Sequence, residues 1–257
     1  MQVWKVRIAE PASDSGMPTN PQSWALSRRP ASSLDVIPDN YQAYEISHFC
    51  VSPKYRDYLE RLMIPNGLIK DRIEKVASEI VEHYEKQKVQ HIIAICVLKG
   101  GFKFCVDLID AMERTIRARG TLIPISTDFN TSSTDSITLT GVDDPSIYKG
   151  KDILIVEDIV DSGKTMCRLN KYLSTLHAKS VTDVCLLVKR TPRSSGYRPC
   201  FAGFEIPDDF VVGYALDYNE YFRDLHHICV LNKVGLEYFA VSEGAVNHAA
   251  EESKPST

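Results

Sequence analysis

The sequence is organised around one stretch, Ile153-Leu154-Ile155-Val156-Glu157-Asp158-Ile159-Val160-Asp161-Ser162-Gly163-Lys164-Thr165. Its first four residues are apolar and mostly β-branched, as is typical of a strand covered on both faces in a parallel sheet. Two carboxylates then mark the expected end of the strand, and a polar turn leads into apolar residues at helical spacing. This order predicts a phosphate held on backbone N–H groups at a helix N-terminus. The carboxylates would face hydroxyls, water or Mg²⁺.

This stretch has two other interpretations. Gly163-Lys164-Thr165 matches the end of the nucleotide-binding pattern G-x-x-x-x-G-K-[ST]. The first glycine of that pattern would fall at Asp158, whose charge would repel phosphate, so a P-loop nucleoside triphosphatase is excluded. A strand–turn–helix connection with a capping Asp or Ser, and no function, is the remaining alternative. Three acids around one turn favour a functional site.

Composition limits the class of protein. The chain has 257 residues and a net charge of −4, which gives no overall basic field for nucleic acid. No apolar run approaches the roughly 20 residues of a membrane helix. The seven cysteines are odd in number and scattered without a C-x-x-C pair, which is typical of reduced thiols in a cytoplasmic protein. We therefore expect no nucleic-acid partner, no membrane contact and no zinc site.

The two ends of the chain differ from its middle. Residues 1–35 carry several Pro and Ser residues and contain no apolar core of a secretory signal, so we expect a disordered N-terminal extension. Residues 242–257 have the same character and are expected to be a disordered tail. Residues 36–241 are expected to form one domain.

Within that domain, helical and strand patterns alternate. Ile69, Ile73, Val76, Ala77, Ile80 and Tyr84 lie on one face of an expected helix. Apolar runs predict strands at 91–98, 122–129, 153–156, 181–188, 210–214 and 228–231. The alternation predicts an α/β fold with a twisted, mainly parallel sheet flanked by helices. Ligands of such sheets lie beyond the carboxyl ends of the strands.

Polar clusters follow four of these expected strands: Lys99-Gly100-Gly101, Glu157-Asp158, Lys189-Arg190 and Asp217. Because the carboxyl ends of parallel strands meet at one edge, we expect these clusters to form a single active site. The alternative is four unrelated solvated turns.

The segment from Val156 to Met166 resembles the PRPP-binding motif of type I phosphoribosyltransferases. Three further blocks narrow the resemblance to the hypoxanthine-guanine members of that family: Leu98 to Phe104, Leu187 to Arg193, and Phe204 to Leu225. The resemblance extends from about Ile37 to Ala240. It implies the type I phosphoribosyltransferase fold, with a small hood built from N- and C-terminal segments.

The resemblance also implies an activity. A 6-oxopurine, hypoxanthine or guanine, would displace pyrophosphate from PRPP with the help of Mg²⁺ and yield IMP or GMP. Such enzymes are usually homodimers or homotetramers. The differences among hypoxanthine, guanine and xanthine as substrates are too small to be ranked from sequence.

The resemblance assigns a role to each matching position. Asp161 would be the general base at purine N7, and the run Ser162, Gly163, Lys164 and Thr165 would hold the 5′-phosphate. Glu157 and Asp158 would face the ribose hydroxyls and Mg²⁺, and Asp217 would bind Mg²⁺ near the base. Pyrophosphate would be bound by Lys99, Gly100 and Arg223, and the turn at Lys99 and Gly100 often carries a cis peptide in the family. The purine would be bound by Lys189, Phe210 and Val211.

Two of these positions have simpler explanations. Phe210, in an apolar strand, is by default a core residue, and Arg223 could form a surface pair with Asp224. The resemblance favours the functional roles, since an aromatic face suits a flat base and a leaving pyrophosphate needs cations.

One segment departs from the family pattern. The family has a long loop with a Lys-Ser-Tyr segment that closes over the reacting centre, whereas residues 129–141 are several residues shorter and contain no Lys, Arg or Tyr. Closing loops exclude water and complete a site. The shortened lid, Asn130 to Ser136, therefore predicts reduced or altered activity. The alternative is a non-catalytic or regulatory nucleotide-binding paralogue that assembles with a full-length relative, although an intact Asp161 favours an enzyme.

Overall fold

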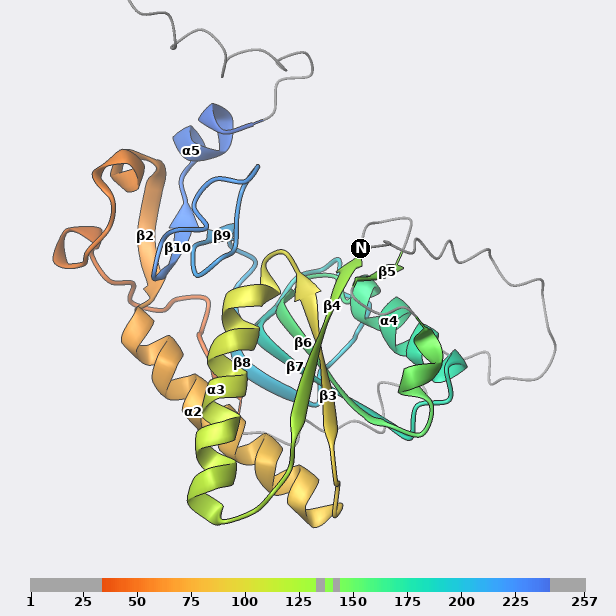
Figure 1. Cartoon of the computed structure of the whole chain (residues 1–257). Helices are drawn as coiled ribbons and strands as arrows, with labels where there is room; N and C mark the ends of the chain where they lie inside the picture. Colours follow the sequence, from red (N-terminus) through yellow and green to blue (C-terminus); the bar gives the residue numbers. More distant parts are fainter. Residues whose placement is uncertain (1–33, 133–136, 141–143, 241–257) are drawn as a thin grey trace, which may run out of the picture.

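A computed structural model of the chain describes residues 34–132, 137–140 and 144–240. They form a seven-stranded sheet in the order β1-β8-β7-β6-β3-β4-β5, with helices on both faces (Figure 1). All neighbours pair parallel except β4 and β5, which pair antiparallel at the edge. The strands are β1 (Asp35–Val36), β3 (Ile92–Leu98), β4 (Ile125–Ser132), β5 (Ile137–Thr140), β6 (Asp152–Val160), β7 (Ser180–Lys189) and β8 (Phe201–Ile206). The predicted fold class is confirmed.

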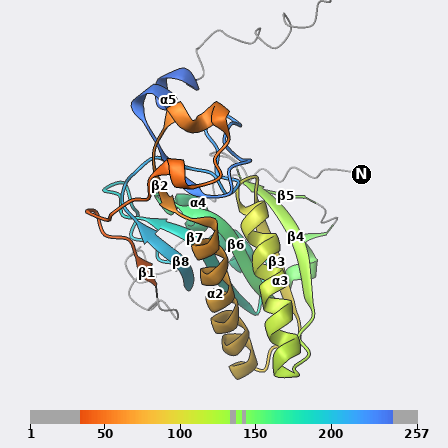
Figure 2. The ribbon, with the colours of Figure 1, turned by 90° about the vertical axis from the view of Figure 1, so that its left-hand side faces the viewer.

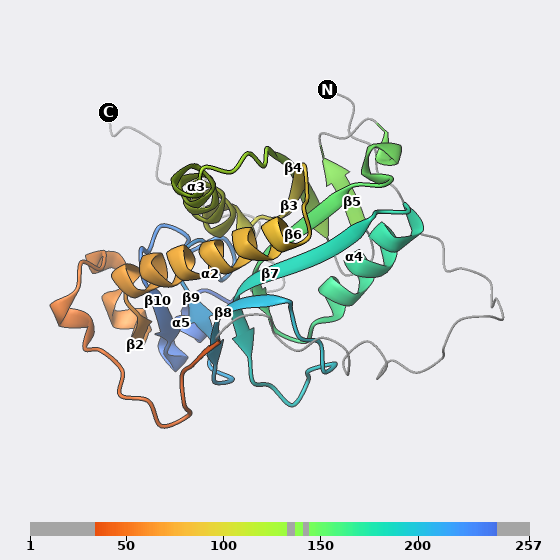
Figure 3. The ribbon, with the colours of Figure 1, turned by 90° about the horizontal axis from the view of Figure 1, so that it is seen from below.

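Three long helices cover the sheet (Figures 2 and 3). α2 (Asn66–Lys86) and α3 (Gly101–Arg119) lie on one face, where their apolar side chains pack against Ile92, Cys96, Leu154 and Val156. α4 (Lys164–Thr175) lies on the other face, against Ile93, Ile95, Ile153 and Ile155. Successive strand residues thus serve opposite faces, as the apolar runs predict. Short 3₁₀ turns occupy η1 (Ile46–His48), η2 (Pro53–Tyr58) and η3 (Pro145–Tyr148).

β6 is longer than the sequence pattern indicates. We expected it to end at Val156, but it continues to Val160. Its pairing with β3 stops at Val156, whereas its pairing with β7 extends through Ile159↔Leu187 and Val160↔Val188. Backbone bonds to β7 therefore keep Glu157 and Asp158 extended within the strand, and the polar turn begins only at Asp161.

The smaller sheet, with the helix that follows it, forms the hood: β2 (Leu59–Ile64), β10 (Ile228–Leu231), β9 (Val211–Val212) and α5 (Lys233–Tyr238). β10 pairs antiparallel to both neighbours, so the expectation that 210–214 and 228–231 join the parallel sheet was wrong. These strands are short, and Gly213 turns the chain at once with a φ of +96°. The hood combines an N-terminal and a C-terminal segment, as expected.

Strands β1, β2, β5 and β8 were missing from the sequence prediction, and β8 is the one that matters for the site, because it pairs with β7 beside Lys189. The expected end segments lie outside the described residues, apart from 34–35, where β1 begins. In the described part of the chain, no helix combines the length and apolarity needed to cross a bilayer.

Candidate active site

A cavity of about 290 Å³ opens at the carboxyl ends of β3 and β6. Its walls come from the end of β3 with the turn after it, and from the second half of β6 with the loop that leads into α4. The lining residues are Val97, Leu98, Gly100, Glu157, Asp158, Ile159, Val160, Asp161, Ser162, Gly163, Thr165 and Met166. The sequence prediction that these two polar clusters meet at one edge is confirmed.

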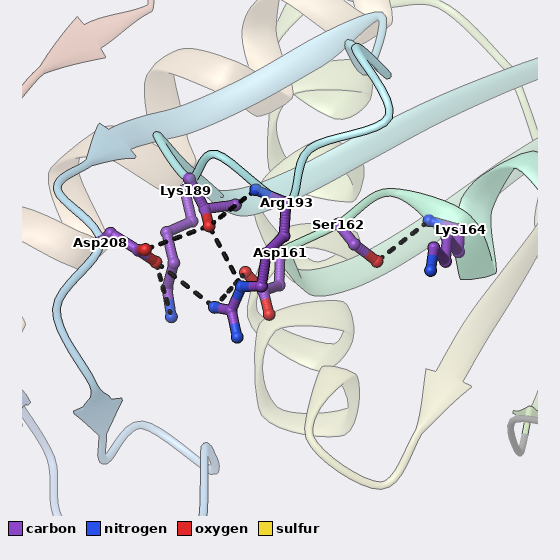
Figure 4. Close-up of polar contacts among 7 residues, drawn as sticks. Asp161, Ser162, Lys164, Lys189, Arg193 and Asp208 are labelled. Carbon is purple, nitrogen blue, oxygen red and sulfur yellow. Dashed lines mark hydrogen bonds and ion pairs between the residues drawn. The ribbon is translucent and has the colours of Figure 1, made fainter.

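The loop before α4 has the shape of an anion cradle. Gly163 adopts a left-handed conformation with φ +78°, and α4 begins at the next residue. The N-cap residue, Gly163, offers no side-chain cap, and Ser162, Gly163 and Thr165 line the cavity. Backbone N–H groups at such a helix N-terminus are donors that a phosphate would accept. The Ser162 hydroxyl accepts a long bond of 3.5 Å from the Lys164 N–H (Figure 4).

Glu157 and Asp158 are adjacent carboxylates on β6. Glu157 is buried and Asp158 is partly buried. Burial, together with the neighbouring Asp158 carboxylate, raises the pKa of Glu157 well above its ordinary value. Asp158 accepts the Ile159 N–H at 2.8 Å, which fixes its carboxylate toward the cavity wall. Two neighbouring carboxylates that are shielded from water are stable only when a proton or a bound cation neutralises part of their charge.

The turn after β3 lies against Asp158. The Leu98–Lys99 peptide bond is cis, as the resemblance led us to expect. A Cβ built on Gly100 would lie 1.7 Å from Asp158 Oδ2, so only glycine fits there. The Lys99 ammonium lies 2.9 Å from Glu220 Oε1, on the loop after β9.

A second group of polar side chains lies at the ends of β6 and β7 (Figure 4). Arg193 Nη2 lies 3.4 Å from Asp161 Oδ1 and 3.5 Å from Asp208 Oδ1. Asp208 also lies 4.0 Å from the Lys189 ammonium and accepts the Thr191 hydroxyl at 3.1 Å. The Lys189 side chain is 10% exposed. The structure therefore brings Asp161 and Lys189 to the same edge and links them through Arg193 and Asp208.

The hood supplies the remaining predicted residues. Phe210 is 40% exposed and meets Tyr218 edge-on at 5.1 Å, so the alternative that it is a core residue was wrong. Val211 is buried in β9. Asp217 does not follow a strand of the parallel sheet, contrary to our prediction, because the strand before it is β9 of the hood.

The alternative partner of Arg223 was also wrong. Its guanidinium lies 2.8 Å from Asp217 and 3.2 Å from Glu220, whereas Asp224 pairs with Lys54. Lys99, Glu220, Arg223 and Asp217 thus form one chain of alternating charges between the main domain and the hood. Both cations predicted to bind pyrophosphate belong to this chain.

Three residues that the sequence did not single out take part in this region. Arg193 and Asp208 connect Asp161 to Lys189, and Tyr197 packs against Gly163. Arg193 lies three residues after Arg190 of the Lys189-Arg190 cluster, and this proximity was the available signal. Asp208 and Tyr197 belong to the segments on either side of β8, a strand that the apolar pattern did not reveal.

The described residues contain no group of three His, Cys, Asp or Glu side chains arranged to hold a metal without other ligands. Mg²⁺ is usually bound by one or two carboxylates together with water and substrate phosphates. The Glu157–Asp158 pair has that composition, and it lines a cavity next to an anion cradle. The donor set therefore fits Mg²⁺ bound jointly with a phosphorylated substrate.

A family model, curated proteins and a solved structure were each found to be similar to this chain. Residues 64–219 match the model of the phosphoribosyl transferase domain family. The hypoxanthine-guanine phosphoribosyltransferase of Schistosoma mansoni is 49% identical over 89% of this chain and 83% of its own. The human protein of the same name is 49% identical over 78% of this chain and 94% of its own.

A solved structure is also similar. The crystal structure of the Schistosoma mansoni hypoxanthine-guanine phosphoribosyltransferase in complex with IMP matches with a TM-score of 0.72 and 48% identity. The match covers 81% of this chain and all of that chain. The whole domain, and not only the phosphate loop, is therefore similar to proteins of this kind.

Proposed function

Since this chain belongs to the phosphoribosyltransferase family, among its hypoxanthine-guanine members, we propose that its cavity is where PRPP, Mg²⁺ and a 6-oxopurine react to give IMP or GMP and pyrophosphate. The observation that carries the proposal is the meeting of an anion cradle, the Glu157–Asp158 carboxylate pair and Asp161 in one cavity. Purine salvage by phosphoribosyl transfer is the activity of the family members that it resembles.

In the proposed reaction, purine N9 forms a bond to C1′ of PRPP while the bond from C1′ to pyrophosphate breaks. The 5′-phosphate would lie on the N–H groups of Ser162 to Thr165, which the left-handed Gly163 turns toward the cavity. Backbone donors at a helix N-terminus suit a phosphate dianion because their dipoles are already oriented. The Ser162 and Thr165 hydroxyls would add side-chain bonds.

Asp161 is proposed to accept the proton that the purine gives up at N7. Its carboxylate is half-exposed and lies at the cavity mouth, where a base can approach it. Lys189 would donate to purine O6, because its ammonium is nearly buried at the neighbouring strand end. Phe210 would stack on the base and Val211 would contact the edge of the base through its backbone, as the resemblance implies.

Glu157 and Asp158 are proposed to hold the ribose hydroxyls and Mg²⁺, and Asp217 is proposed to contribute to a metal site near the base. Bound Mg²⁺ would neutralise the charge that builds on departing pyrophosphate. Lys99, Gly100 and Arg223 would bind the same pyrophosphate. In the structure, Glu220 lies between the two cations, so pyrophosphate would replace a carboxylate that they already share.

The shortened lid supports the proposal of reduced or altered activity. β4 and β5 pair antiparallel from Phe129↔Thr140 to Ser132↔Ile137. Residues 133–136, between those arms, lie outside the described residues. Residues 129–141 contain no Lys, Arg or Tyr to close on the reacting atoms. Grafting the longer family loop is expected to raise kcat more than it changes base affinity.

The test is a steady-state assay of the full chain with PRPP, Mg²⁺ and a panel of hypoxanthine, guanine and xanthine. Formation of IMP or GMP supports the proposal, and rates equal to those of a full-loop relative would contradict the reduced-activity part. No turnover with any base, combined with a GMP-induced rise in Tm, would favour the non-catalytic, nucleotide-binding paralogue. Sedimentation of the same sample tests the expected homodimer or homotetramer.

A further inference from the structure

The segment from Arg193 to Cys200, between β7 and β8, packs directly on the loop that is proposed to hold the 5′-phosphate. The Ser195 N–H donates to the Ser162 carbonyl at 2.9 Å. A Cβ built on Gly163 would lie 2.5 Å from Tyr197 Cβ and 2.9 Å from Ser195 Oγ. The 193–200 segment therefore packs behind the loop so closely that it leaves no room for a side chain at position 163.

Tyr197 holds the 193–200 segment in place through hydrogen bonds of its hydroxyl. Its hydroxyl donates to the Asp183 carboxylate and accepts the Asn170 amide N–H at 2.9 Å. Asp183 lies on β7 and is fully buried, and its other oxygen accepts the Cys200 N–H at 2.9 Å. Asn170 lies on α4 and also donates to the Met166 carbonyl at 3.0 Å. The Tyr197 hydroxyl thus connects the 193–200 segment to β7 through Asp183 and to α4 through Asn170.

We infer that Tyr197 is a positioning residue for the 5′-phosphate: it acts through Gly163 and α4, and it touches neither substrate nor metal. Its ring packs against the left-handed Gly163. Its hydroxyl, through Asn170 in the second turn, holds α4 at a fixed distance from β7. Both effects keep the N–H groups of Ser162 to Thr165 aimed at one point. Binding a compact dianion depends steeply on such convergence.

This inference rests on the proposed function, and it makes a distinct prediction about which ligand is affected. Losing the hydroxyl should weaken ligands that carry a 5′-phosphate, namely PRPP and IMP. It should leave the free base unaffected, because Phe210 and Val211 belong to the hood and Lys189 lies six residues after Asp183, at the end of β7. A purely structural residue would lower Tm without this split between ligands.

The experiment compares Tyr197→Phe with the wild-type chain by calorimetric titration of IMP and by KM values for PRPP and hypoxanthine. Tyr148→Phe is the matched control. Tyr148 lies in the same apolar cluster and also donates to a carboxylate, Asp128, at 3.1 Å, but it does not contact the phosphate loop. Asn170→Ala is the second variant, because it removes the other partner of the Tyr197 hydroxyl at a helical position where alanine fits.

We expect Tyr197→Phe and Asn170→Ala to raise the Kd of IMP and the KM of PRPP about 5- to 10-fold, the effect of one lost hydrogen bond. The KM of hypoxanthine at saturating PRPP should change less than about twofold. Tyr148→Phe should lower Tm without changing the Kd of IMP. An unchanged Kd of IMP in both test variants, or an equal rise in the Tyr148→Phe control, would overturn the inference. A wild-type chain that neither binds IMP nor turns over would overturn the proposed function instead.

Discussion

Arg193 Nη2 lies 3.4 Å from Asp161 Oδ1, and the same nitrogen lies 3.5 Å from Asp208 Oδ1. The carboxylate proposed as the general base is therefore linked to the side chain that holds Lys189, the proposed donor to the purine oxygen. One guanidinium thus couples the proposed general base to the proposed O6 donor. Because Arg193 is two-thirds exposed, this coupling adjusts position more than it adds stability.

Lys189→Met is expected to remove the charged donor to O6. Loss of one charge-assisted hydrogen bond lowers kcat/KM for hypoxanthine and guanine by about 10- to 100-fold. The KM of PRPP should stay close to that of the wild-type chain. Steady-state kinetics with each substrate varied in turn measure both values. Lys86→Met, at a solvated helical position, is the control, and a loss of PRPP affinity in place of purine affinity would refute the role of Lys189.

Gly100→Ala is expected to damage PRPP binding. The added methyl would lie 1.7 Å from Asp158 Oδ2, so the turn after β3 or the carboxylate must move. A clash of that kind costs about 1–3 kcal/mol, or roughly 5- to 150-fold in the KM of PRPP.

Gly67→Ala is the matched control for that substitution, since nothing lies within 4 Å of its Cβ position in the first turn of α2. Its kinetics should equal those of the wild-type chain. Equal effects of the two alanines would show that Gly100 has no special place at the cavity.

Stability is expected to depend on the protonation of His227. Burial lowers the pKa of its imidazole, and the charges of His226 and Lys103 lower it further. Its Nδ1 accepts the Asn66 N–H at 3.0 Å, which requires the neutral ring. Because the folded pKa lies below the unfolded value of about 6.5, the unfolded chain takes up the proton first as pH falls. The contribution of His227 is therefore complete above that pH and is lost below it.

Urea unfolding at pH 7.5 and 5.5 measures this effect. The wild-type chain should lose more free energy of unfolding between the two pH values than His227→Gln does. His226→Gln, at the exposed neighbouring position, should retain the loss seen in the wild-type chain. Identical pH dependence in all three proteins would exclude His227 as the titrating group.

Much of this architecture was readable from the sequence because buried parallel strands leave long apolar runs. The runs at 91–98, 153–156 and 181–188 predicted β3, β6 and β7, and the polar residues after them predicted the site edge. The end of β6 was not predictable, because Glu157 and Asp158 look like turn residues until their pairing with β7 is known. The hood was misassigned for the related reason that short strands carry too little pattern to show their partners.

The residues behind the site needed the tertiary structure. Asp208 and Tyr197 act through contacts with residues 14 or more positions away, such as Lys189, Asp183 and Gly163. Nothing in their local sequence distinguishes an Asp or a Tyr of this kind from an ordinary loop residue. Only the packing of the 193–200 segment on the phosphate loop reveals them.

The central claim is that Asp161 removes the purine proton while neighbouring groups hold PRPP. The most direct measurement is kcat for hypoxanthine with saturating PRPP and Mg²⁺, for the wild-type chain and for Asp161→Asn, with the Kd of IMP measured on both. A lost general base predicts a fall in kcat of about 10²- to 10⁴-fold, with little change in the Kd of IMP or in Tm. An Asp161→Asn variant that turns over at the wild-type rate would contradict the account.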